Sequence, residues 1–63
     1  MKYTRTQLWN IQQSMRTYGG GFVQQLSVLL PLADDENIEK LINAFPEYFE
    51  KYLEMSKYLK DNL

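Results

Sequence analysis

Apolar residues recur along the chain at spacings of three and four, the pattern that one face of an α-helix produces. The first run consists of Leu8, Ile11, Met15 and Tyr18. Thr4 precedes this run and Gln7 follows three residues later, which is the form of a capping box, where each side chain bonds to the other residue's backbone amide. The pattern therefore predicts a first helix over residues 4–18.

A run of glycines, Gly19 to Gly21, interrupts the first helix because a glycine inside a helix costs about 1 kcal/mol relative to alanine. We expect Gly19 to take the left-handed conformation that commonly follows a helix. The next apolar run consists of Phe22, Val23, Leu26, Leu29 and Leu30. It predicts a second helix over 21–30. Pro31 disfavours helical angles at Leu30, so the helix either ends there, as we expect, or continues with a kink.

Two further helices follow in the second half of the chain. Asp34 is suited to cap a third helix over 35–44, with Asp35 and Glu36 complementing its positive end. Pro46 then prevents the third helix from continuing and favours the start of a fourth, over 46–60. The apolar residues of these helices are Ile38, Leu41, Ile42 and Phe45 in the third and Phe49, Tyr52, Leu53, Leu59 and Leu63, with Ser56 among them, in the fourth. No segment alternates as a strand does, so we expect an all-α fold: a compact bundle of four short helices forming a single domain, residues 1–63.

A chain of 63 residues is close to the lower limit at which one hydrophobic core offsets the loss of conformational entropy. The chain contains neither cysteine nor histidine, which excludes disulfides and argues against the usual tetrahedral metal sites. Association with further copies is the remaining source of stability. We therefore expect a homodimer or a higher homo-oligomer.

Aromatic residues concentrate around Pro46. Four of the nine aromatic side chains lie within eight residues there: Phe45, Tyr48, Phe49 and Tyr52. Aromatic rings bury a large area per residue and are enriched at interfaces between proteins. We predict that these four residues mediate self-association.

Charge is unevenly distributed, although the net charge is only −1. Residues 1–33 carry three basic side chains and no acid, whereas residues 34–63 carry eight acids and four lysines. Binding to a nucleic acid backbone requires many basic contacts, and the acidic half would repel phosphate. This distribution argues against nucleic-acid binding, although a small helix-turn-helix regulator is kept as an alternative.

The basic residues of the first half lie close to the only tryptophan on a helical wheel. Lys2, Arg5, Trp9 and Arg16 fall within about 60° of one another, with Gln12 and Gln13 beside them. Tryptophan and arginine are the residues most enriched among interface hot spots, and Arg5 can stack on Trp9 one turn away. We predict a surface for an acidic protein partner made of Lys2, Arg5, Trp9, Gln13 and Arg16. The alternative is that Trp9 only covers the edge of the core.

No motif indicates catalysis, a cofactor or a metal. The three glycines lack the lysine and Ser/Thr of a phosphate-binding loop, and acid pairs such as Glu50 and Glu54 have no histidine to complete a metal site. The serines have no histidine base. We expect no enzyme and no cofactor. No apolar run reaches the ~18 residues of a membrane helix, and a secretion signal is not evident, so we expect a cytoplasmic protein without membrane contact.

The chain also resembles a class of very short helical proteins encoded by phages and prophages. The similarity is carried by the segments Met15–Val23, Leu32–Asp34 and Ala44–Tyr52, with the pattern TYGG-F, LAD and AFPEYFEKY. The resemblance implies an accessory protein that binds and inhibits a bacterial host protein, such as a defence or regulatory factor. It also allows a structural subunit of a phage assembly as an alternative.

Overall fold

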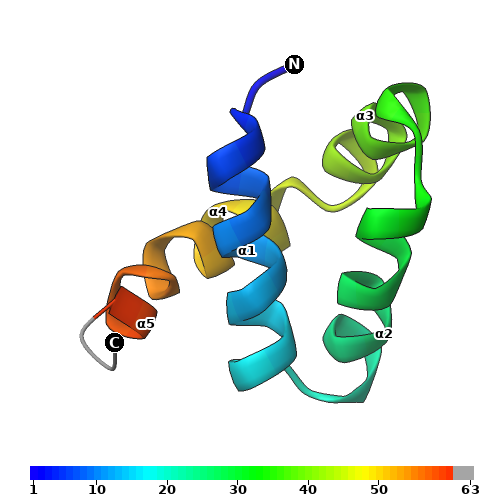
Figure 1. The fold of residues 1–63 in the computed structure, drawn as a ribbon. Helices are drawn as coiled ribbons and strands as arrows, with labels where there is room; N and C mark the ends of the chain where they lie inside the picture. The colour runs from blue at the N-terminus through cyan, green and yellow to red at the C-terminus, as the bar shows by residue number, and fades with distance from the viewer. Residues whose placement is uncertain (61–63) are drawn as a thin grey trace.

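The computed structural model describes residues 1–60, which form helices and no strands (Figure 1). The elements are α1 (Arg5–Tyr18), α2 (Gly21–Leu29), the single 3-10 turn η1 (Leu30–Leu32), α3 (Asp35–Ala44), α4 (Pro46–Met55) and the short α5 (Lys57–Lys60). The predicted all-α bundle of four short helices is confirmed, with α5 as an additional turn.

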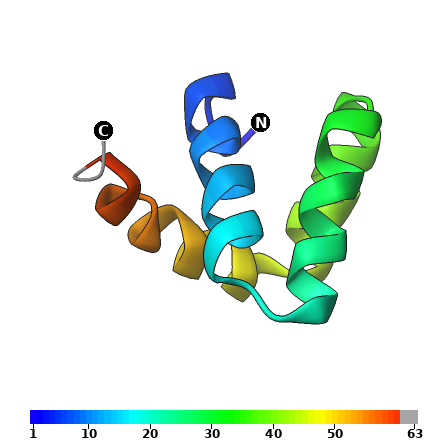
Figure 2. The ribbon, with the colours of Figure 1, turned by 60° about the horizontal axis from the view of Figure 1, so that its bottom comes forward.

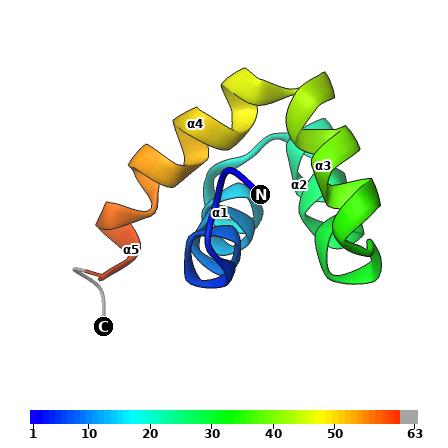
Figure 3. The same ribbon diagram turned by 90° about the horizontal axis from the view of Figure 1, so that it is seen from above.

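The central element is α1, whose most extensive contacts are with α2 and α4. The chain turns back after α1 so that α2 runs beside it, and α3 then returns near α2 (Figure 2). Seen from above, α4 and α5 extend along another side of α1, away from α3 (Figure 3). The two halves of the chain thus meet around α1.

The two predicted side-chain caps, Thr4 and Asp34, are confirmed. The Thr4 backbone N–H donates to Gln7 Oε1 at 2.9 Å, and the Gln7 N–H donates to Thr4 Oγ1 at 3.0 Å, which completes the capping box. Asp34 Oδ1 accepts from the Asn37 N–H at 2.9 Å. These bonds satisfy amides that have no partner inside the helix.

The turn between α1 and α2 differs from the expectation. Gly19 has φ −76° and ψ 153°, an extended conformation, so the predicted left-handed cap is wrong. The glycine is needed for space: a Cβ at Gly19 would lie 2.5 Å from the Met15 carbonyl oxygen and 2.5 Å from Val23 Cγ1. The close approach of the start of α2 to the end of α1 therefore explains this glycine.

The second helix ends at Leu29, within one residue of the prediction, but the conformation at Leu30 and the continuity of the fourth helix differ from the expectation. Leu30 keeps helical angles, φ −57° and ψ −47°, despite Pro31, and the chain tightens into η1. The predicted helix over 46–60 is divided at Ser56, whose N–H is shared between the Tyr52 and Leu53 carbonyls and whose hydroxyl donates to Leu53 O at 2.6 Å. Such back-bonding of a serine competes with the regular helical ladder. Leu63 lies outside the described residues.

The core lies where α1 meets α2 and α4. Its buried apolar side chains are Tyr3, Ile11, Met15, Val23, Leu26, Leu30, Ile42, Phe49 and Tyr52. Leu8, Ile38, Leu41, Phe45, Leu53 and Met55 pack against it from the edge. Three side chains that the spacing assigned to apolar faces are instead substantially exposed: Tyr18, Phe22 and Leu29.

Candidate protein-interaction surfaces

The outward side of α1 carries four of the five residues predicted to bind a partner: Arg5, Trp9, Gln13 and Arg16. Helical spacing aligns them, because residues three and four apart share a face. Trp9 is 59% exposed, Gln13 is half-buried, and both arginines are exposed. Neither Arg5 nor Arg16 forms an ion pair within residues 1–60. We call these four residues the α1 strip.

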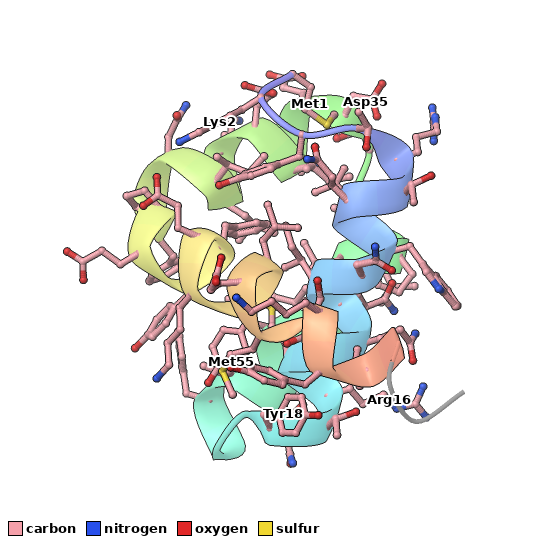
Figure 4. All side chains as sticks on the ribbon, turned by 90° about the vertical axis from the view of Figure 1, so that its left-hand side faces the viewer. Met1, Lys2, Arg16, Tyr18, Asp35 and Met55 are labelled. Carbon is pink, nitrogen blue, oxygen red and sulfur yellow. The ribbon has the colours of Figure 1, made fainter. Side chains whose placement is uncertain are left out.

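Lys2, the fifth predicted residue, does not belong to this strip. It precedes the helix, so its wheel position has no meaning, and its ammonium lies 3.1 Å from Glu50 Oε1 of α4. Figure 4 shows Lys2 and Arg16 toward opposite ends of the molecule. The hydrogen bond with Glu50, and the nearby Tyr3 ring, raise the pKa of Lys2 above its ordinary value of 10.5. Lys2 therefore joins the N-terminal segment to α4.

A shallow hollow of about 160 Å³ adjoins Trp9. Its lining residues are Arg5, Leu8, Trp9, Gln12, Leu30, Pro31 and Ile38. The hollow thus borders the basic strip with apolar side chains from η1 and α3. The predicted stacking of Arg5 on Trp9 is absent from the cation–π contacts of residues 1–60, which involve lysines and tyrosines. Both side chains therefore remain available to a partner.

The predicted self-association surface on the fourth helix is partly wrong. Phe49 is fully buried and stacks on Tyr3, with ring centroids 6.1 Å apart, while Tyr52 is 5% exposed. Both residues lie in the core of a single chain, because α4 packs on α1 through the side that carries them. They are not accessible to a second molecule.

Phe45 and Tyr48, the other two predicted residues, lie at the surface beside Phe22 of α2. The Phe22 and Phe45 rings meet edge to face at 5.5 Å, and Tyr48 lies 5.9 Å from each of them. Phe22 is 58% exposed, and Tyr48 is also accessible. These three rings form an aromatic cluster that links α2 to the start of α4.

An exposed apolar surface on α2 and η1 was not predicted from the sequence. Its most exposed members, on the outer side of α2 and η1, are Phe22, Val28, Leu29 and Leu32. A signal was present: residues 17–33 include no charged side chain. The spacing of apolar residues did not reveal this surface, because Phe22 and Leu29 stand three or four residues from buried positions and were therefore expected in the core. We call these four residues the α2 outer face.

Two lysines pair with acids three or four residues before them. Lys40 Nζ lies 3.7 Å from Glu36 Oε1 within α3, and Lys57 donates to Glu54, which raises the pKa of Lys57 above its ordinary value of 10.5. All of these side chains are well exposed, so each pair adds little stability. Within residues 1–60, Arg5, Arg16 and Lys51 form no ion pair, and of these three only the arginines lie beside Trp9 on the α1 strip.

The serines of the chain are poorly placed for nucleophilic chemistry. Ser14, Ser27 and Ser56 are all buried, and the hydroxyls of Ser27 and Ser56 donate to backbone carbonyls of their own helices. Within residues 1–60 there is no group of three or more acidic side chains positioned to hold a metal ion. In the same range, every helix is too short or too polar to cross a membrane.

No family model, curated protein or solved structure matches this chain.

Proposed function

We propose that this chain is a non-enzymatic accessory protein that binds another protein through the α1 strip. The observation that carries the proposal is the 59% exposure of Trp9 between two arginines that have no acidic partner in the described part of the chain. A large amphipathic ring with unpaired guanidinium groups on the same face is the composition typical of interface hot spots. Carboxylates of a partner would supply the missing acids, with bidentate hydrogen bonds to each guanidinium.

The hollow beside Trp9 adds shape to this surface. An apolar side chain of the partner would enter it, between Trp9 and the apolar side chains of η1, while acids around it would meet Arg5 and Arg16. The expected partner surface is therefore an apolar residue surrounded by carboxylates. The resemblance to small phage proteins adds a biological setting to the proposal: the partner is a bacterial defence or regulatory protein, inhibited in the host cytoplasm.

The proposal is tested by capture from a bacterial lysate with the wild-type chain and two strip variants. Trp9→Ala and Arg16→Glu are each expected to reduce capture of the partner at least about tenfold, since hot-spot truncations cost 2 kcal/mol or more. Lys51→Glu reverses the same charge on α4 and serves as the matched control, with capture unchanged. Circular dichroism checks that every variant keeps its helix content.

Two outcomes would contradict the proposal. Equal capture by the wild type and both strip variants would remove the α1 strip as the binding site. Salt-sensitive retention of DNA or RNA in a gel shift, lost in Arg16→Glu, would instead identify a nucleic-acid-binding regulator, because phosphate contacts weaken steeply as salt increases.

A further inference from the structure

The α2 outer face has the spacing of a helix that packs on two sides. Phe22 and Leu29 are seven residues apart and Leu32 follows three later, a repeat that places them along one line of a helix surface. Phe22, Leu29 and Leu32 are 58%, 49% and 78% exposed. The adjacent side of the same helix buries Val23, Leu26 and Leu30 in the core. Gln24 and Gln25 keep part of α2 polar, but its apolar surface is wider than the part that the core covers, and apolar helix surface is normally buried.

The apolar surface extends from α2 onto α3. One hollow of about 470 Å³ and another of about 280 Å³ lie between these elements and share Leu29 and Leu41. The aromatic cluster of Phe22, Phe45 and Tyr48 borders the second hollow. Lys40 is the one charged residue among those that line the two hollows, and Glu36 already neutralises it. The face is therefore broad, grooved and almost free of charge.

The lack of charge on the α2 outer face indicates which molecule covers it. In a two-fold symmetric dimer the same patch meets itself, so a patch with net charge would repel its own copy. The α1 strip, with two unpaired arginines, is unsuited to such a contact. The α2 outer face has no charge to repel, and its protruding leucines lie beside hollows that leucines of a second copy would fill. Depletion of charge is also what distinguishes the core of an interface from other protein surface.

The available area agrees with a small dimer. Four side chains that each expose about half or more of their surface contribute on the order of 400 Å² per chain. With the neighbouring side chains of α3 and the aromatic cluster, a two-fold contact covers about 1,000 Å² in total, which is near the lower limit for a specific interface. A weak, concentration-dependent dimer is the expected result.

We propose that the α2 outer face, Phe22, Val28, Leu29 and Leu32, binds the same face of a second copy of this chain in a two-fold symmetric dimer. This inference moves the predicted self-association from the fourth helix to the second. It is independent of the proposed function, since the dimer contact uses none of the α1 strip.

Sedimentation equilibrium from about 1 µM to about 1 mM tests the dimer over the range in which weak interfaces form. The wild-type chain is expected to change from monomer to dimer. Leu29→Lys and Leu32→Lys each place a charge opposite an apolar copy and are expected to weaken the dimer at least about 100-fold. Thr6→Lys adds the same charge at an exposed site of α1 and should leave the dimer intact, as should Arg16→Glu.

Leu29 and Leu32 are exposed in one chain, so circular dichroism of the monomeric variants should show unchanged helix content. A wild-type chain that stays monomeric across the whole range overturns the proposal, including the case in which that monomer binds phospholipid vesicles or another protein through this face. A dimer that Leu29→Lys and Leu32→Lys leave intact, or a large assembly that grows with concentration, would overturn it equally.

Discussion

The outward sides of α1 and α2 differ sharply, although the two helices are neighbours in sequence and pack on each other. The exposed side of α1 carries Trp9 between arginines that form no ion pair with residues 1–60, whereas the exposed side of α2 carries apolar residues without any charge. Their inward sides are alike, since each buries apolar residues and one serine. The two helices thus share one core, and the difference in charge is the reason why we propose an acidic partner for one surface and a second copy of the chain for the other.

The largest expected effect is a difference in the free energy of unfolding between substitutions on the inward and outward sides of α1. Met15 is completely buried where α1 meets the rest of the core, so Met15→Ala removes buried contacts and leaves a cavity. It should lower the free energy of unfolding by about 2–5 kcal/mol, which is much of the stability of a small domain. Arg16→Ala, one residue later on the exposed side, should change it by about 0.5 kcal/mol or less. Urea denaturation followed by circular dichroism measures both, and equal losses would refute the division into two sides.

A second prediction concerns the turn that brings the two helices together. Gly19→Ala would push a methyl group against the Met15 carbonyl and the Val23 side chain, at a cost of about 1–3 kcal/mol. Gly21→Ala is the matched control, because nothing lies within 4 Å of a Cβ there and α2 begins at this residue. It should stabilise the chain by about 0.4–1 kcal/mol. Thermal unfolding should show a lower Tm for Gly19→Ala and a higher Tm for Gly21→Ala. Shifts of the same sign would show that the start of α2 does not lie as close to the end of α1.

The helix starts provide a third, smaller contrast. α1 has a complete capping box, whereas Gly20 caps α2 without any side-chain hydrogen bond. Thr4→Ala should therefore cost about 1 kcal/mol, and Gly20→Ser should add only a few tenths. Chemical denaturation of the two variants checks the difference. If Gly20→Ser instead lowered the free energy of unfolding by as much as Thr4→Ala, the geometry of the turn, and not the cap, would determine where α2 begins.

The sequence predicted the local structure well because its signals are local. Thr4 with Gln7, Asp34 and Pro46 each mark a helix start through bonds or angles within one turn. The division of the last predicted helix was missed because the Ser56 hydroxyl can either face solvent or bond to Leu53, and the pattern of apolar residues does not distinguish these options. Pro31 was expected to end helical angles at Leu30, yet a tighter 3-10 turn accommodates it.

The surfaces were harder to predict, since they depend on which helix covers which. Arg5, Trp9, Gln13 and Arg16 share a face by helical geometry alone, so the strip was found. Phe49 and Tyr52 were placed at an interface because ring content says nothing about whether α1 already covers them. The α2 outer face was missed for the converse reason: Phe22 and Leu29 were assigned to the core, and no role was assigned to Val28 or Leu32.

The smallest expected effect concerns Lys2, which the wheel had assigned to the strip. Its pKa is higher in the folded chain than the unfolded value of 10.5, because Glu50 accepts a hydrogen bond from its ammonium. Its contribution to stability is therefore complete below about pH 10.5 and is lost as the pH rises through the folded pKa. The difference in unfolding free energy between the wild type and Lys2→Gln should shrink over that interval. A difference that is constant from pH 8 to pH 12 would show that the pair is not formed.

The charge-free segment from Thr17 to Ala33 has a consequence once the chain loses its structure. Charged gatekeepers keep unfolded molecules apart, and here they stand only at the two ends, Arg16 before the segment and Asp34 after it, with none in the 17 residues between. Heating at high protein concentration should therefore leave precipitate that does not redissolve on cooling, while dilute samples refold. Leu32→Lys should improve recovery after heating, so the residue that we propose to pair native chains would also determine how well they survive a heating cycle.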